Sequence, residues 1–152
     1  MTKTIKEIQE EIIEEFSKYA DWSDIENDNN KYFHLIELGR ALPPIDATMK
    51  SEKNIIDGCQ SKVWLTAKVE NDKMIYFADS NTEITKGIIS LLIRVFSNQT
   101  PDDIINANMD FLKEMGLENH LSPTRANGLI IMIKQMKLYA LASKARLSNK
   151  KV

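Results

Sequence analysis

This sequence contains few of the residues that most often supply reactive chemistry. Its 152 residues include one cysteine, Cys59, and two histidines, His34 and His120. One cysteine cannot form a disulfide within the chain, and zinc sites and iron–sulfur clusters usually need several cysteine or histidine ligands. We therefore expect no internal disulfide, no resident cofactor, and no metal or cluster held by a single chain.

Further absences narrow the class of protein. The formal net charge is −2, so no excess of positive charge favours nucleic acid as a partner. No apolar run is long enough to cross a bilayer, and residues 1–7 lack the apolar core of a signal peptide. No glycine-rich phosphate loop or dinucleotide fingerprint occurs. These absences predict a cytoplasmic, reduced protein that binds neither nucleic acid nor a membrane.

The composition is that of an ordinary folded domain. Hydrophobic residues make up 43% of the chain and charged residues 28%, values typical of a globular protein with a core. No repeat or linker divides the sequence. We expect one domain over residues 1–152, with a basic tail at 148–152 that is disordered.

Helical signals dominate the first part of the chain. A Thr-x-x-Glu capping box that starts at Thr4, followed by apolar residues at helical spacing, predicts a helix over about residues 5–20. A second helical pattern begins near Tyr32, and Gly39 stands where a helix commonly ends. Two prolines at 43–44 then favour an extended loop toward the cysteine.

A β-hairpin is predicted directly after the cysteine. Residues 62–70 and 73–78 alternate between apolar and polar side chains, and Asn71-Asp72 supplies the turn between them. The apolar face should contain Val63, Leu65, Ala67 and Val69, matched by Ile75 and Phe77.

Helices return after the hairpin. A second capping box over residues 80–83 predicts a long helix, and two short helices should begin near Thr100 and Phe111. A last helix should begin at Ser122-Pro123. The sequence therefore predicts an α+β fold, in which a small antiparallel sheet packs against several helices and Cys59 lies on a loop at the sheet edge.

The local setting of Cys59 indicates that its thiol is presented to another molecule. Gly58 permits backbone angles that other residues rarely adopt, so it can hold the thiol on a tight turn. Gln60 and Ser61 follow, and the strand beyond them supplies a rigid base, which is how loops often carry function. The alternative is that Cys59 is a small buried hydrophobe, as free cysteines often are.

Three charged or basic residues are candidates to tune this thiol. Lys62 is three residues from Cys59, although an ordinary solvated strand residue is the alternative. Arg125 is predicted in the first turn of the last helix, where the dipole disfavours a cation, so we expect it to pair with a carboxylate or to guide an anion. His120 stays open as a base, because a nucleophile and its base need only meet in space.

The motifs of this chain, taken together, resemble those of the SufE family of sulfur acceptors. They cover roughly residues 32–136 in the family's order and are specific in combination. They are Asn54-x-Ile56-x-Gly58-Cys59-Gln60-Ser61-x-Val63-Trp64; Asp79-Ser80 with Ile84-x-Lys86-Gly87; Thr100-Pro101-x-Asp103-Ile104; and Leu121-Ser122-Pro123-x-Arg125-x-Asn127-Gly128-Leu129.

The resemblance implies a sulfur carrier and activator rather than a stand-alone enzyme. Cys59 would take persulfide sulfur from a SufS-type cysteine desulfurase, whose pyridoxal phosphate stays on the desulfurase, and pass it to a SufBCD-type scaffold for iron–sulfur cluster assembly. Arg125 would tune the thiol or dock the partner. The supporting loop would comprise Gly58, Gln60, Ser61 and Asp79.

The resemblance also implies a fold like that of iron–sulfur scaffold proteins. We expect the chain to be a monomer or a weak homodimer. One departure from the family's pattern is Asp57, where many relatives carry an apolar residue or proline. An acid two positions from Cys59 is expected to raise the pKa of its thiol.

Two other functions compete with sulfur transfer. Cys59 can serve a thiol-dependent enzyme of the hydrolase or peroxidase type, which needs a base beside the sulfur. The chain can also be a non-catalytic interaction module in which Cys59 only fills space.

Overall fold

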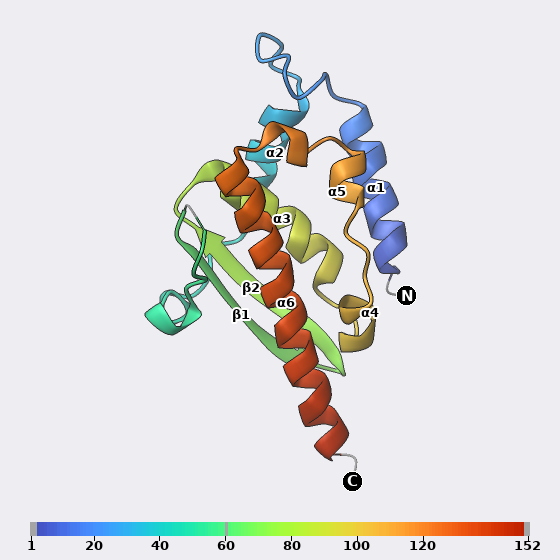
Figure 1. The fold of residues 1–152 in the computed structure, drawn as a ribbon, viewed down its shortest axis with the longest axis vertical. Helices are drawn as coiled ribbons and strands as arrows, with labels where there is room; N and C mark the ends of the chain where they lie inside the picture. The colour runs from blue at the N-terminus through green and yellow to red at the C-terminus, as the bar shows by residue number, and fades with distance from the viewer. Residues whose placement is uncertain (1–2, 60, 151–152) are drawn as a thin grey trace.

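The computed structural model, which describes residues 3–59 and 61–150, combines helices with one two-stranded antiparallel sheet (Figure 1). The strands are β1 (Val63–Glu70) and β2 (Lys73–Ser80). The helices are α1 (Ile5–Ser17), α2 (Lys31–Arg40), α3 (Glu83–Phe96), α4 (Pro101–Ile105), α5 (Phe111–Glu114) and α6 (Pro123–Lys150), with short 3-10 turns η1 (Ala47–Met49), η2 (Glu52–Asn54) and η3 (Glu118–His120). The predicted α+β class is confirmed.

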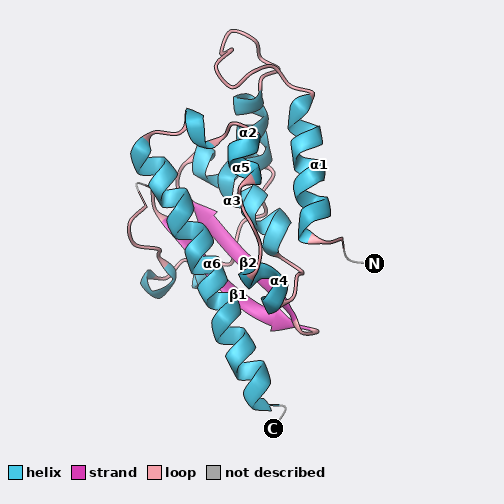
Figure 2. Cartoon of the chain, turned by 45° about the vertical axis from the view of Figure 1, so that its right-hand side comes forward, coloured by secondary structure: helices cyan, strands magenta, loops and turns pink. Residues whose placement is uncertain are grey.

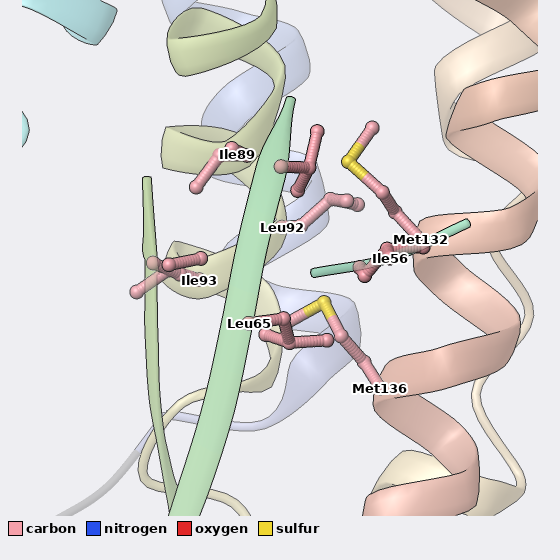
Figure 3. Close-up of a pocket in the computed structure, with 9 residues that line it drawn as sticks. Ile56, Leu65, Ile89, Leu92, Ile93, Met132 and Met136 are labelled. Carbon is pink, nitrogen blue, oxygen red and sulfur yellow. The ribbon is translucent and has the colours of Figure 1, made fainter. Parts of the chain in front are cut away.

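The elements form layers around a core between the hairpin and the helices. Figures 1 and 2 show α6 lying along one face of the hairpin with α3 beside it, while α1 and α2 pack against α3 on the side away from the strands. Side chains from the strands, α3 and α6 meet around a small apolar cavity (Figure 3). They include Leu65, Ile89, Leu92, Ile93, Met132 and Met136, together with Ile56 from the loop before β1.

The hairpin turn is as predicted, but β2 faces the core with the side chains that were predicted to lie on its polar face. Asn71 and Asp72 both have positive φ, 54° and 62°, as a tight two-residue hairpin turn requires. The register pairs Glu70 with Lys73 and Val69 with Met74.

As a result, Met74, Tyr76 and Ala78 are the buried apolar residues of β2. The prediction that Ile75 and Phe77 share the apolar face was wrong. The two-residue turn sets the register, and the register overrides the greater hydrophobicity of isoleucine and phenylalanine.

Gly39 was predicted to end a helix, and the structure gives it a different task. α2 continues to Arg40, with Ala41 as its C-cap. A Cβ on Gly39 would lie 2.5 Å from the backbone nitrogen of Gly87 in α3, and a Cβ on Gly87 would lie 2.4 Å from the Leu35 carbonyl oxygen. The two glycines therefore allow the α2 and α3 backbones to touch where these helices cross.

The two predicted capping boxes had different outcomes. At α1 the box is present in both directions, because Thr4 Oγ1 accepts from the Glu7 backbone and Glu7 caps Thr4. The helix ends at Ser17, a turn earlier than expected. The second box is absent, because Ser80 is the last residue of β2 and its hydroxyl donates to the Lys62 carbonyl at 2.7 Å.

The last helix is longer than the sequence indicated. α6 runs to Lys150, so the tail expected to be disordered from residue 148 is helical in its first three positions, and positions 151–152 lie outside the described residues. No helix within the described part of the chain is long and apolar enough to span a membrane.

Candidate functional site

Cys59 lies where the loop after η2 turns into β1, at the edge of the hairpin, as predicted. Gly58 has φ of +90°, in the region that disfavours other residues. A Cβ at this position would also lie 2.7 Å from Ile131 Cδ1 on α6. The glycine therefore both makes the turn and lets the loop lie directly on α6.

The thiol of Cys59 is half-buried against the start of α6. Its sulfur lies 3.9 Å from the carbonyl oxygen of Gly128, a distance at which a thiol makes a weak contact. Burial raises the pKa of the Cys59 thiol. Asp57 is exposed and adds nothing to this shift, so burial, and not the neighbouring acid, sets the direction.

Ser61 ties the other side of the cysteine loop to the beginning of α3. Its hydroxyl lies 3.0 Å from Thr82 Oγ1 and 3.3 Å from Thr85 Oγ1, and the two threonine hydroxyls are 2.8 Å apart. This closed ring of three hydroxyls holds the loop beside the helix. Gln60, predicted in the same supporting set, falls outside the described residues.

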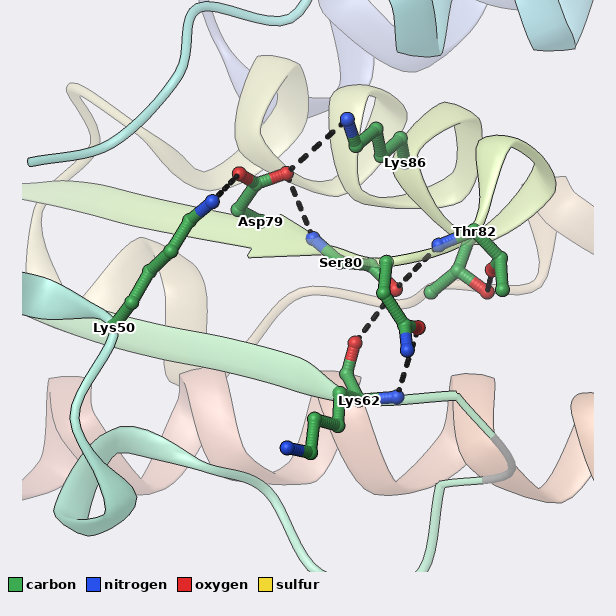
Figure 4. A network of polar contacts seen from close by, with 8 residues as sticks. Lys50, Lys62, Asp79, Ser80, Thr82 and Lys86 are labelled. Atoms are coloured by element: carbon green, nitrogen blue, oxygen red, sulfur yellow. Dashed lines mark hydrogen bonds and ion pairs between the residues drawn. The ribbon is translucent and has the colours of Figure 1, made fainter. Parts of the chain in front are cut away.

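Asp79, at the end of β2, is a buried carboxylate that joins three segments (Figure 4). One oxygen lies 3.1 Å from Lys50 Nζ, and the other accepts from the Ser80 backbone at 2.8 Å and lies 3.8 Å from Lys86 Nζ. Asp79, which was predicted to support the cysteine loop, therefore contacts three segments: the loop before β1 (residues 41–62, called the pre-β1 loop), β2 and α3.

Lys62 contributes to this region through its backbone. Its N–H donates to Asn81 Oδ1 at 3.1 Å and its carbonyl accepts from Ser80 Oγ (Figure 4). The side chain is exposed, which agrees with the interpretation of Lys62 as an ordinary solvated residue, although β1 begins one residue later than predicted, at Val63.

Arg125 occupies the first turn of α6, as predicted, with its backbone nitrogen donating to Ser122 Oγ at 3.2 Å. Its side chain is half-buried. Within residues 3–59 and 61–150 the guanidinium has no hydrogen-bond or ion-pair partner, so the predicted pairing with a carboxylate is not found there.

The two histidines lie in other parts of the fold. His34 Nε2 lies 2.8 Å from Glu15 Oε2, and its ring stacks on Tyr19 with centroids 4.1 Å apart. His120 stacks on Trp22. In the described part of the chain neither ring contacts Cys59, and no group of three or more His, Cys, Asp or Glu side chains is placed to hold a metal ion.

Several residues of this region had no signal in the sequence. Lys50 stands in a polar stretch far from Asp79 along the chain, and Ile131 is one of several apolar residues in α6. Gly128 was part of a recognised motif, but its contact with the thiol depends on how α6 crosses the loop.

These features define a class: an α+β protein with one half-buried thiol on a tight turn at the entrance to a two-stranded hairpin. The family model described as "SufE: Fe-S metabolism associated domain" matches residues 10–140, and the chain belongs to the SufE family. This membership confirms the resemblance found in the motifs and associates the chain with iron–sulfur metabolism.

Two further similarities agree with this assignment. The chain is 34% identical over 131 residues to an uncharacterized SufE-like protein of Synechocystis sp. (strain ATCC 27184 / PCC 6803 / Kazusa), covering 86% of this chain and 79% of that protein. A solution structure of a hypothetical protein from Thermus thermophilus matches with a TM-score of 0.72 and 18% identity, over 91% of this chain and 96% of that one. The second similarity concerns the fold alone.

Proposed function

We propose that this protein accepts sulfur from a SufS-type cysteine desulfurase through Cys59 and passes it on for iron–sulfur cluster assembly. The observation that carries the proposal is the position of the chain's only cysteine, on a glycine turn at the hairpin edge, in a member of the SufE family. The pyridoxal phosphate belongs to the desulfurase. A SufBCD-type scaffold is the proposed receiver, and the cytoplasm is the proposed setting.

The transfer is an exchange between a thiolate and a persulfide. Cys59, as a thiolate, attacks the terminal sulfur of the persulfide on the desulfurase cysteine, and a new sulfur–sulfur bond forms to Cys59. The bond within the donor persulfide breaks, and the donor sulfur leaves as a thiolate with the electron pair. The terminal sulfur keeps its proton, so the step involves no net oxidation and needs no metal or cofactor on this chain.

The resting environment of Cys59 suggests that the partner takes part in activating it. Burial raises the thiol pKa, which lowers the thiolate fraction at neutral pH in the free protein. The same burial shields a persulfide from water and reductant. We expect amide hydrogen exchange around residues 57–61 to rise when the desulfurase binds; an unchanged exchange rate in a confirmed complex would count against activation by the partner.

Arg125 is proposed to dock the desulfurase. The guanidinium has no partner among the described residues, and burial accounts for the shift in the Cys59 pKa. A half-buried cation that pairs with none of the described residues is suited to pair with an acidic group on another protein.

The central test is the stimulation of a SufS-type desulfurase by wild type and by Cys59→Ser, measured as sulfide released from L-cysteine. The serine variant should fold normally, as judged by circular dichroism, and give no stimulation. Mass spectrometry of the wild type after turnover should show one added sulfur atom on the peptide containing Cys59. Full stimulation by Cys59→Ser would show that the thiol is not the acceptor.

The competing functions have less support. A hydrolase or peroxidase needs a base at the sulfur, and His34 and His120 are engaged with other aromatic residues. For an interaction module, Cys59 should resist alkylation in the folded state with or without a desulfurase, whereas an acceptor should be labelled at least when the desulfurase is present.

A further inference from the structure

The segment between α2 and β1 that carries Cys59 has few apolar ties to the rest of the protein. Among the described residues from 41 to 62, Ile56 is the only buried one, at 8% exposure. Segments with so few buried contacts open easily unless other interactions hold them. The position of the thiol therefore depends on a small number of specific contacts.

One of these contacts is the ion pair between Lys50 and Asp79. The Lys50 ammonium lies 3.1 Å from Asp79 Oδ2 and also 5.4 Å from the centre of the Trp64 ring, the residue opposite Asp79 in the hairpin. Asp79 is 5% exposed, and a buried carboxylate is costly to leave without a cation. The pair therefore binds the pre-β1 segment to the outer face of the hairpin.

A short series of contacts connects Lys50 to the turn that carries the thiol. The Asn54 side chain donates to the carbonyl of Met49, the residue before Lys50, at 2.9 Å. Ile55 forms an isolated antiparallel β-bridge with Trp64, and the Ile56 N–H donates to the Val63 carbonyl at 2.9 Å. Cys59 is three residues after Ile56. The hydrogen bond of Ile56, the last contact of this series, therefore restricts where Cys59 can lie.

Lys86 holds Asp79 without holding the segment. Its ammonium lies 3.8 Å from Asp79 Oδ1, but Lys86 is on α3, outside the pre-β1 loop. Figure 4 shows the two lysines approaching the carboxylate from different elements. Replacing Lys86 removes a charge near Asp79 and leaves the link to the loop, so Lys86 offers a matched comparison.

We propose that Lys50, through its ion pair with Asp79, is a positioning residue that holds the Cys59 turn against α6 and so keeps the thiol shielded. The meaning of this shielding for sulfur transfer rests on the proposed function. The effect on the thiol itself requires no desulfurase and is measured on the isolated protein.

The test measures the alkylation rate of Cys59 by iodoacetamide between about pH 6 and pH 10, where thiols ionise. Lys50→Met keeps the apolar stem beside Trp64 and removes the charge. It should raise the rate at neutral pH about tenfold, as expected when a charge-assisted contact is lost, and lower the pH midpoint of labelling. Amide exchange over residues 46–58 should rise with it.

Three variants control this result. Lys50→Arg, which keeps a cation, should label close to the wild-type rate. Lys86→Met and Ser51→Ala should label within about twofold of wild type. The first leaves the Lys50 link, and the second removes a buried hydroxyl that has no hydrogen-bond partner among the described residues. The charged residues Asp57 and Lys62 on the loop and Arg125 on α6 are unchanged in all variants.

The double variant Lys50→Met/Asp79→Asn distinguishes two effects of Lys50→Met. One is loss of the link between residue 50 and the hairpin, and the other is the buried Asp79 carboxylate left without the Lys50 cation. The double variant removes both charges, and it should label as fast as Lys50→Met if the link is what matters. A wild-type rate in the double variant, or in a folded Lys50→Met, overturns the proposal. An equal increase in Lys86→Met does so as well, because any change near Asp79 would then have the same effect. Loss of sulfur transfer alone would leave these results untouched.

Discussion

At the scale of single residues, the proposed chemistry of this protein depends on one thiol and on what covers it. Cys59 contacts Gly128 and lies on a turn made by Gly58. A glycine on each side of the contact lets backbone, rather than side chains, surround the sulfur. The thiol is therefore half-buried against backbone, which suits the shielding and later presentation that we propose for it.

The first residue-scale prediction concerns the ionisation of Cys59. Because burial raises its pKa, folding favours the neutral thiol, and this contribution to stability is complete below the ordinary cysteine pKa and is lost as the pH rises through the raised value. Alkylation of the native protein should therefore reach its midpoint at a higher pH than alkylation of a peptide of residues 55–63. A midpoint at or below that of the peptide would contradict a buried resting thiol.

The second residue-scale prediction concerns Arg125. Arg125→Ala should lower stimulation of the desulfurase about tenfold or more, the scale of a lost charge-assisted contact worth about 1.5–3 kcal/mol. Binding measured by calorimetry should weaken while the Cys59 pKa and the melting temperature stay unchanged. Arg125→Lys should restore part of the affinity, since a lysine keeps the charge but loses the planar fork.

The opposite pattern would change the role of Arg125. A raised Cys59 pKa with unchanged binding would indicate tuning of the thiol instead of docking. Wild-type activity, pKa, binding and stability together would make Arg125 an ordinary surface residue.

At the scale of elements, close packing at one helix crossing supports the site from a distance. α2 and α3 touch at Gly39 and Gly87, and α3 begins with the threonines that hold Ser61. The position of the start of α3 therefore depends on how near α2 can approach it.

Gly39→Ala should destabilise the fold, because the new methyl group would meet backbone atoms at 2.5–2.9 Å that cannot rotate away. Overpacking of this kind costs about 1–3 kcal/mol, more than the roughly 1 kcal/mol gained from the better helix propensity of alanine. Urea denaturation measures the difference.

Gly128→Ala is the matched control for this substitution. Its Cβ would lie 3.7 Å or more from its neighbours, an ordinary contact. The variant should keep or slightly gain stability. Equal losses in both variants would mean that the α2–α3 crossing is not special.

At the scale of the whole molecule, a cluster of three polar side chains joins the N-terminal helices to α3. Glu15 on α1 pairs with His34 on α2 and with Arg94 on α3, at 2.8 Å and 3.0 Å. Burial opposes ionisation of Glu15, but the hydrogen bonds from Arg94 and His34 outweigh it and hold its pKa below the ordinary value.

This lowered pKa predicts an acid-dependent loss of stability. The contribution of Glu15 is present above the ordinary glutamate pKa and is lost as the pH falls through the lowered native value. Glu15→Gln should therefore flatten the acid side of a plot of melting temperature against pH. Glu14→Gln, one position away and exposed, should leave the slope as in wild type, and the same slope in both variants would remove Glu15 from this role.

Local features of this fold were determined by the sequence itself. The capping box at Thr4, the turn at Asn71-Asp72 and the glycine turn before Cys59 each depend on interactions within a few residues, so pattern alone predicted them correctly. The place of Arg125 in the first turn of α6 was predictable for the same reason. The family motifs occur along this chain in the family's order, and they agreed with this local interpretation.

The tertiary structure decided what the local pattern could not. Register placed Met74, not Ile75, in the core, and strand pairing took the Ser80 hydroxyl away from its predicted cap. The crossing of α2 and α3 determined the role of Gly39. The Lys50–Asp79 pair arose in the same way. Each outcome depends on which distant segments meet when the chain buries its apolar faces, and the free energy of that burial outweighs local preference.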